Sequence, residues 1–423
     1  MASGVAVHRE NAVDTLYPRC AGIDVHKGNV VAWVRCGDRP GKAFEEVRTF
    51  SAMTADLLAL SDWLAEQGVT HVAMESTGVY WKPVFNLLEA RFAVILVNAE
   101  HIKKVPGRKT DVKDCQWIAQ LLQHGLLKAS FIPPAPIREL RDLTRQRTQL
   151  VEERTAAANR IHKVLEDANI KLGSVATDVL GASGRDMLEA LIAGQTDPER
   201  LADLARKRLR AKIPELQRAL HGRVTEHHRF LLRMHLDHID HLEGLIGRLS
   251  ARVEELMAPF ARDRERLETI PGISQRVAET VLAEIGNRME QFPTAGHLAS
   301  WAGMCSGSNE SAGKRRSGRT TKGDRWLKRA LVQAAWAASH TKATYLAAHY
   351  RRLAKRRGRK KALVAVGHTL LVIIYHVLRR GTTYQELGPD FLDRLEPERL
   401  TRQLVKRLEA LGHKVTLEAC PAA

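Results

Sequence analysis

The sequence predicts an α/β domain followed by a predominantly helical remainder, and three observations carry this prediction. Short apolar strand patterns alternate with helical patterns up to about residue 130. Apolar repeats with heptad spacing occupy the chain beyond residue 136. Between them, the proline-rich segment 131–136 cannot continue a helix, because proline lacks an N–H group and fixes φ. A chain of 423 residues is long enough for two or three domains, so a boundary is expected in this segment.

The N-terminal region, residues 1–130, is expected to form a sheet with helices packed on it. Residues 20–36 predict two apolar strands around a turn at 26–29, and a strand over 44–50 extends them into a meander. Helices and strands then alternate. They are a helix over 54–67, a strand over 70–74, a helix over 79–90, a strand over 92–97, and a helix over 110–125 with Thr110 as its N-cap.

Residues 136–260 predict a coiled-coil arm of two long helices. The first helix carries a 3-4 seam of Leu140, Leu143, Leu150, Ala157, Ile161, Val164 and Ala168, with Arg147 and Arg154 at two seam positions. The second carries Ile239, Leu242, Ile246, Leu249, Val253 and Leu256. Residues 173–220 between them are expected to be a helical insertion. Such an arm pairs within the chain or with another subunit, and self-association is the favoured interpretation.

Residues 262–380 are predicted to be helical again, with a tail over 381–423. Near its start, an apolar helix stops at Pro271 and Gly272 and another begins near Ser274, as in a helix-hairpin-helix. In that motif the glycine turn and the free N–H groups of the second helix receive a backbone phosphate, which makes Gly272 and Ser274 candidate nucleic-acid contacts. An ordinary helical turn would have the same sequence pattern.

The charge of the chain favours a polyanionic partner. With 66 Lys and Arg against 48 Asp and Glu, the net charge is +18, and each neutralised phosphate releases counterions. No secretory leader is apparent, and the apolar stretch 362–378 is interrupted by polar residues, so a buried helix is expected in place of a membrane span. The five cysteines form no C-x-x-C pair, which fits a reducing cytoplasm.

The positive charge is concentrated between Lys314 and Lys361, where 17 Lys and Arg accompany one acid, Asp324. This density is typical of a nucleic-acid interface. The candidate contacts are Lys314, Arg315, Arg316, Arg319, Lys322, Arg325, Arg356, Arg357, Arg359 and Lys360. Within the region, segment 351–361 could instead be a mobile basic loop without sequence preference. Its tryptophans, with Trp301 just before it, could stack on bases, but their helical context favours core packing for Trp301, Trp326 and Trp336.

Four acids are placed where a metal site would require them. Asp24 lies in the first strand, Glu75 ends the fourth, and Asp111 and Asp114 stand at i, i+3 on one helix. Hard cations such as Mg²⁺ or Mn²⁺ prefer oxygen ligands and would offset the repulsion between the carboxylates. Considered singly, Asp24 could merely border a turn, and the two later acids could only favour a helix start.

In combination, these segments resemble the DEDD-type insertion-sequence transposases of the one-ten family, which also includes the pilin-gene DNA invertase. The matching blocks are G-I-D-V-H-K at 22–27, M-E-S-T-G at 74–78, R-K-T-D-V-K-D at 108–114, and IPGIS at 270–274 followed by the basic block 298–338. The resemblance covers the chain to about residue 380. It implies a RuvC-like (RNase H-like) fold for residues 1–130 and assigns Asp24, Glu75, Asp111 and Asp114 to the metal-binding tetrad of a DNA-recombining enzyme.

The same resemblance implies a serine nucleophile in the C-terminal domain that becomes linked to a DNA phosphate, and Ser311 is the best match. Serine is a weak nucleophile that needs a base or a metal, while Lys314, Arg315, Arg316 and Arg319 supply cations for the transition state. Relatives often have S-G directly where this chain has N-E-S-A-G-K, so Ser306, Ser308 and Ser317 remain competitors. A Gly/Ser-rich loop that only contacts phosphates would need no activated hydroxyl.

The family also implies donor and target DNA as substrates, a homo-oligomer (a dimer or a tetramer of paired dimers) and a structured noncoding guide RNA. The expected reaction is phosphodiester transesterification at a composite site of the tetrad and the serine. Two rival functions remain. One is a hydrolytic RuvC-like Holliday-junction nuclease, in which the carboxylates activate water and no serine is needed. The other is a non-catalytic nucleic-acid-binding scaffold, whose function would rest on the basic surface and the coiled-coil arm alone.

Overall fold

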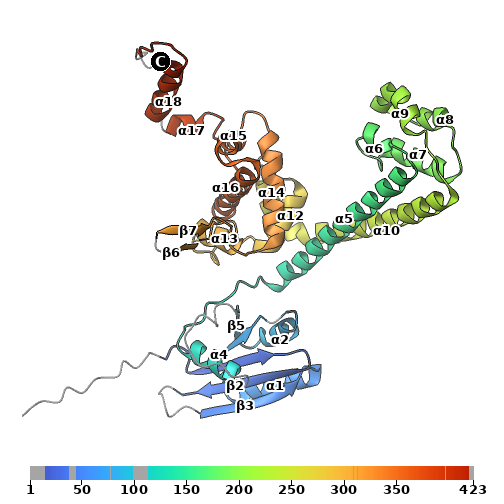
Figure 1. Cartoon of the computed structure of the whole chain (residues 1–423). Coiled ribbons are helices and arrows are strands. Elements are labelled where there is room, and N and C mark those ends of the chain that lie inside the picture. The colour runs from blue at the N-terminus through green and yellow to red at the C-terminus, as the bar shows by residue number, and fades with distance from the viewer. Residues whose placement is uncertain are drawn as a thin grey trace, which may run out of the picture. The chain divides into compact units, whose positions relative to one another are not determined.

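The computed structural model describes residues 15–37, 44–76, 78–98, 113–307, 309–311, 313–395 and 397–418. The chain divides into two compact units, Met1–Ile132 and Pro133–Ala423 (Figure 1). The change of unit falls within the proline-rich segment 131–136.

The first unit is a five-stranded mixed sheet with the order β3-β2-β1-β4-β5. The strands are β1 (Arg19–Val25), β2 (Asn29–Cys36), β3 (Phe44–Ser51), β4 (His71–Glu75) and β5 (Ala93–Val97). β1 pairs antiparallel with β2 and parallel with β4, and β4 pairs parallel with β5. The predicted meander and the α/β alternation that follows it are therefore confirmed.

Among the described residues of this unit, three helices cover the two faces of the sheet. They are α1 (Thr54–Glu66), α2 (Trp81–Leu88) and α4 (Lys113–Gln123). One apolar cluster joins α1 and α2 to one face, and a second cluster joins α4 to the other. The predicted helix start at Thr110 lies outside the described residues, which resume at Lys113.

Two long helices begin the second unit, as the heptad spacing predicted. They are α5 (Ala135–Asp167) and α10 (Glu226–Met257). They run antiparallel, because Asp167 at the end of α5 meets His228 near the start of α10, while Arg154 meets Glu243. Seam residues Leu140, Ala157 and Ile161 are fully buried. Formation of a coiled coil with another subunit stays a prediction.

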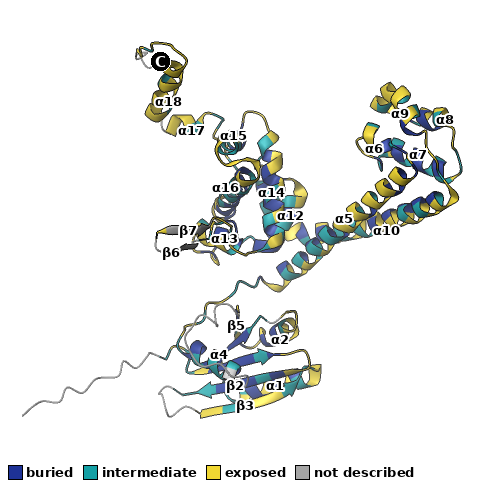
Figure 2. Cartoon of the chain, in the orientation of Figure 1, coloured by how far each residue is buried: buried dark blue, intermediate teal, exposed yellow. Residues whose placement is uncertain are grey.

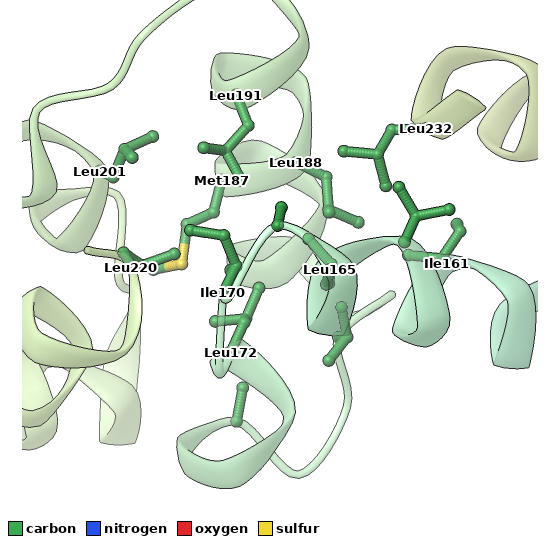
Figure 3. Packing of buried hydrophobic residues seen from close by; sticks show 14 of the residues in the cluster. Ile161, Leu165, Ile170, Leu172, Met187, Leu188, Leu191, Leu201, Leu220 and Leu232 are labelled. Atoms are coloured by element: carbon green, nitrogen blue, oxygen red, sulfur yellow. The ribbon is translucent and has the colours of Figure 1, made fainter. Parts of the chain in front are cut away.

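The insertion between the long helices has a hydrophobic core of its own. Its elements are α6 (Leu172–Val175), α7 (Ala182–Ile192), α8 (Pro198–Asp203), η1 (Lys207–Lys212) and α9 (Ile213–Ala219). Met187 and Leu188 of α7 are fully buried in a cluster with Ile161 of α5 and Leu232 of α10 (Figure 3). The insertion therefore covers the apolar ends of the two arm helices.

The remaining helices form a C-terminal bundle around α16. They are α11 (Ala261–Glu268), α12 (Gln275–Ile285), α13 (Ala295–Trp301), α14 (Arg325–His340), α15 (Tyr345–Arg357) and α16 (Arg359–Arg380), with η2 (Ala258–Phe260) before them. A short ribbon of β6 (Asn309–Ser311) and β7 (Lys314–Ser317) lies between α13 and α14. The tail holds α17 (Phe391–Leu395) and α18 (Pro397–Ala410), which have no buried residues (Figure 2).

α16 is the one helix in the described part of the chain that is long and apolar enough to cross a membrane. Val366, Leu370 and Ile374 on it are nevertheless fully buried within the bundle. Tyr375 is 1 % exposed, and its hydroxyl donates to the backbone oxygen of Phe292 at 3.0 Å. Such burial is typical of a core helix, as the sequence predicted for this stretch.

Candidate functional site

Alternation along β1 and β4 places two of the predicted acids on the same face of the sheet. Ile23 on β1 and Met74 on β4 pack with α1 and α2, so the residue after each belongs to the opposite face, which α4 covers. Ile23 and Met74 are also register partners of the parallel pair. Asp24 and Glu75 are therefore neighbours at the carboxyl ends of adjacent parallel strands, where α/β sheets bind ligands.

The third described acid, Asp114, lies in the first turn of α4. This helix packs tightly on β1 at Gly22, where an added Cβ would lie 2.1 Å from the Cys115 carbonyl oxygen and 2.5 Å from the Ala119 nitrogen. Burial raises the pKa of the Cys115 thiol, and the negative charges of Asp24 and Asp114 raise it further. Both carboxylates therefore lie within electrostatic reach of one thiol.

The oxygen donors at this end of the sheet have the chemistry that Mg²⁺ and Mn²⁺ prefer. Asp24 is partly exposed and its Oδ2 lies 3.1 Å from Nε2 of His26. Among the described residues, no three His, Cys, Asp or Glu side chains lie close enough together to hold a metal ion. Asp111, the fourth member of the predicted tetrad, lies outside the described residues. The structure thus gathers Asp24, Glu75 and Asp114 at one end of the sheet without closing a coordination sphere.

The predicted serine lies on an antiparallel ribbon in the second unit. We call residues 303–323 the serine ribbon. Ser311 ends β6 and is the register partner of Lys314, the first residue of β7. Of its competitors, Ser306 is exposed and pairs with Thr320 in an isolated bridge, and Ser317 is the register partner of Asn309. Ser308 lies outside the described residues.

The neck of the serine ribbon depends on two glycines. A Cβ on Gly323 would lie 2.2 Å from the Gly303 nitrogen, and one on Gly303 would lie 2.8 Å from the Gly323 nitrogen. Two backbone hydrogen bonds continue from this neck, Thr321 N to Cys305 O at 3.1 Å and Gly307 N to Arg319 O at 2.9 Å. The segment that the sequence marked as a Gly/Ser-rich loop is therefore a hydrogen-bonded ribbon with a narrow base.

The predicted nucleic-acid contacts are distributed over the ribbon and three helices. Lys314, Arg315 and Arg316 are on β7, and Arg319 and Lys322 follow it. Gly318, Arg319 and Thr320 line a hollow of about 550 Å³ together with Lys361 of α16. The exposed predicted cations on helices are Arg325, Arg356, Arg357, Arg359 and Lys360.

The alternative of a mobile basic loop over 351–361 is wrong, because this segment ends α15 and begins α16. Only Gly358 interrupts the helices, with a φ of +82° that favours glycine. Lys and Arg are good helix formers, and Ala362 and Val366 anchor the start of α16 in the core.

The helix-hairpin-helix candidate shows α11 ending at Glu268 and α12 beginning at Gln275 with Ser274 as N-cap. A Cβ on Gly272 would lie 2.4 Å from the Ala334 carbonyl oxygen of α14. Close packing against α14 is thus a sufficient reason for glycine there. Phosphate binding at Gly272 and Ser274 stays a prediction.

The expectation of core packing is wrong for Trp336, which is 60 % exposed. The apolar face of α14 is made by Leu327, Leu331, Ala334 and Ala338, and Trp336 falls on the other side. Its ring lies 4.6 Å from that of His340. Trp301 is partly buried against Phe292, at a ring distance of 5.6 Å, as expected.

Sequence analysis missed a buried charge cluster between the arm and the bundle. Arg145 of α5 donates two hydrogen bonds of 2.7 Å to the carboxylate of Glu284 on α12, and a third of 2.9 Å to Asp324. Arg141 lies 3.1 Å from the same Glu284, whose side chain is 0 % exposed. In the sequence, Asp324 stands out only as the single acid between Lys314 and Lys361. Arg145 is more than a hundred residues from both acids in sequence, so no local pattern joins them.

Burial raises the pKa of Glu284 to about 7, although the neighbouring arginines lower it. The unfolded carboxyl titrates near 4.5, so between these pH values the folded chain holds a proton that the unfolded chain has lost. We therefore expect stability to fall as pH rises through this window. Glu284→Gln removes the titration. Chemical denaturation should measure the free energy of unfolding of wild type and variant. Between pH 5 and 8 the wild type should lose stability relative to Glu284→Gln. A difference between the two proteins that does not change with pH would contradict the prediction.

Comparisons with known proteins agree with this arrangement. The family model for DEDD transposases of the IS110 type matches residues 21–170, and a model described as "Transposase IS116/IS110/IS902 family" matches residues 264–351. A "Probable family 20 transposase" of Pseudomonas aeruginosa is 27 % identical over 321 residues, which cover 74 % of this chain and 85 % of that protein. The "Transposase for insertion sequence element IS1111A" of Coxiella burnetii is 24 % identical over 299 residues, or 69 % and 72 % of the two chains.

The matches include both the acid-bearing sheet and the serine ribbon, and they define the class of protein as a transposase, an enzyme that cleaves and rejoins DNA. The chain belongs to the IS116/IS110/IS902 family of transposases. The resemblance seen in the sequence motifs is thereby confirmed.

Proposed function

We propose that this transposase cleaves and rejoins DNA by attack of Ser311 on a phosphodiester, assisted by a divalent metal held by Asp24, Glu75, Asp111 and Asp114. The observation that carries the serine is the ribbon itself, which ends β6 at Ser311 opposite Lys314 and is followed by basic residues. The metal assignment is supported by the position of Asp24 and Glu75 at neighbouring strand ends and of Asp114 in the first turn of α4, which covers that face of the sheet.

In the proposed reaction, the Ser311 oxygen forms a bond to phosphorus and its hydroxyl proton leaves to a base. The bond from phosphorus to a deoxyribose oxygen breaks, and that oxygen departs and takes up a proton. Attack by the hydroxyl of another strand reverses these steps and frees the serine. Because one phosphodiester replaces another, the exchange needs no external energy source.

The residues of this chain contribute two kinds of electrostatic help. Lys314, Arg315 and Arg316 follow Ser311 on the ribbon, and cations at the reacting phosphate stabilise the extra negative charge of the transition state. When bound by the acids, Mg²⁺ or Mn²⁺ would polarise a phosphoryl oxygen.

The proposal includes the partners that the family resemblance implies. These are donor and target DNA, a structured noncoding RNA that selects them, and a homo-oligomer. The net charge of +18 favours binding of both DNA and RNA, because each carries a phosphate backbone. The long helices α5 and α10, with exposed Phe230 on α10, offer surface for pairing between copies of the chain.

Ser311→Ala should abolish a covalent protein–DNA adduct, because no other hydroxyl would occupy the attacking position. The protein, purified with the nucleic acid it carries, is incubated with plasmid DNA bearing the ends of its own element. It is then denatured, and adducts are counted on a gel. Ser317→Ala, on the partner strand of the same ribbon, is the matched control and should retain the adduct.

An adduct that survives in Ser311→Ala and disappears in Ser317→Ala would show that the nucleophile is misassigned. Cleavage that leaves free ends in wild type, with Ser311→Ala fully active, would instead identify a hydrolytic nuclease. If the wild-type protein bound this DNA without cleaving it, the protein would be a non-catalytic scaffold.

A further inference from the structure

The neck of the serine ribbon is fastened to the first turn of α14. The ammonium group of Lys328 donates to the Gly303 carbonyl oxygen at 3.2 Å and to the hydroxyl of Thr320, and so joins both sides of the neck. Asp324, the residue after the neck, caps α14 by accepting from the backbone N–H groups of Trp326 and Leu327 at 2.8 Å each. The ribbon and the start of α14 are therefore one connected structure.

Asp324 uses its other carboxylate oxygen to reach a different part of the chain. Oδ2 accepts from Arg145 at 2.9 Å, and the Asp324 side chain is only 9 % exposed. One carboxylate thus holds the helix cap with one oxygen and the arm helix α5 with the other. If Arg145 moved, Asp324 would transmit the movement to the neck of the serine ribbon.

Arg145 has a fixed orientation. Two of its nitrogens bind the two oxygens of Glu284 in a fork, at 2.7 Å each, and Glu284 is fully buried near the end of α12. Arg141, one turn earlier on α5, supports the same carboxylate and also donates to the carbonyl oxygen of Ala283 at 3.2 Å. The guanidinium that contacts Asp324 is therefore held in place by α12.

We infer that Arg145 is a positioning residue, which couples the arm helix α5 to the base of the serine ribbon through Asp324. Its role in the reaction rests on the proposed function, because the ribbon matters for chemistry only if its serine attacks DNA. The coupling of the arm to the ribbon neck is a property of the protein alone and is measurable without DNA.

The chain offers a matched control for a purely structural role. Arg147, two residues along α5, forms an ion pair with Glu279 of α12 at 2.6 Å, and this pair is more deeply buried than that of Arg145 with Glu284. Within the described residues, this pair has no hydrogen bond to the ribbon or its neck. Loss of either pair should weaken the attachment of the arm, whereas only loss of Arg145 should affect the ribbon.

Hydrogen exchange of the full-length protein without added DNA tests the coupling. In Arg145→Gln and in Asp324→Asn, peptides that contain the amides of Gly307 and Thr321 should exchange about tenfold faster than in Arg147→Gln. Asparagine keeps an oxygen to cap α14, so Asp324→Asn removes mainly the link to Arg145. Equal exchange in Arg145→Gln and Arg147→Gln would overturn the inference, whatever the reaction chemistry proves to be.

Adduct formation on the element-end plasmid tests the consequence for the reaction. Arg145→Gln and Asp324→Asn should each slow the adduct by about 10²-fold at saturating DNA with unchanged binding affinity, because small misplacements of a reacting group have effects of this size. The double variant should be no slower than either single one, whereas Arg147→Gln combined with Asp324→Asn should be additive. Arg145→Lys should recover part of the rate.

The two proposals can fail separately. Faster exchange at the neck with no adduct in wild type would leave the coupling intact and remove the serine mechanism. If the wild type forms the Ser311 adduct but Arg145→Gln and Asp324→Asn slow its formation additively, the serine mechanism stands and the coupling is contradicted.

Discussion

Asp24→Asn should reduce DNA cleavage by the transposase by at least about 10³-fold while leaving DNA binding unchanged. The carboxylate lies at the carboxyl end of the central strand β1, beside Glu75 and on the face that α4 covers. An amide of the same size keeps the packing but loses the charge that a divalent cation requires, and metal stabilisation of a transition state is worth several kcal/mol. Cleavage of plasmid DNA bearing the element ends, with binding measured in parallel, provides the comparison.

Asp62→Asn is the matched control for this prediction, because Asp62 is an acid of the same unit that pairs with Arg91 on the surface of the sheet domain. It should retain wild-type cleavage within about twofold, since exposed ion pairs contribute little to stability. Weak cleavage by Asp24→Asn that recovers with Mn²⁺ would strengthen the metal assignment. Full cleavage by Asp24→Asn in Mg²⁺ would contradict it.

The strand positions of Asp24 and Glu75 could be predicted from the sequence because strand periodicity is a local property. The alternation in β1 and β4 decides which face Asp24 and Glu75 occupy, and the parallel pairing then makes them neighbours. The approach of α4 to Gly22 could not be predicted in this way. Gly22 has no side chain, and this lets α4 pack against β1. The sequence shows the glycine but does not show that α4 is the element that packs there.

In the C-terminal bundle, too, features that depend on local sequence patterns were predictable and long-range contacts were not. The exposure of Trp336 was predictable in principle, since it lies off the 3.6-residue stripe of buried residues on α14, but its helical context favoured a core position. The charge cluster of Arg145, Glu284 and Asp324 was not predictable. Its three residues come from α5, from α12 and from the start of α14, so only the packing of these helices brings them together.

Gly22→Ala should strongly destabilise the first unit, Met1–Ile132. The new Cβ would lie 2.1 Å from the Cys115 carbonyl oxygen and 2.5 Å from the Ala119 nitrogen, which are backbone atoms that cannot rotate away. Relief requires α4 to move off β1, and overpacking of this kind costs about 1–3 kcal/mol or more. Because Asp114 lies in the first turn of α4, the same movement separates it from Asp24.

Cleavage by Gly22→Ala should therefore fall by about 10²-fold or more even at a temperature where the variant remains folded, because the displacement of α4 would move Asp114 away from Asp24. Gly28→Ala is the matched control. Gly28 lies in the turn between β1 and β2, and an added Cβ there meets no atom within 4 Å. Thermal unfolding and plasmid cleavage of the two variants, measured together, separate the effects. If Gly22→Ala is destabilised yet cleaves at the wild-type rate while folded, the position of α4 on β1 does not control the acids, and Asp114 would have to be removed from the proposed metal site.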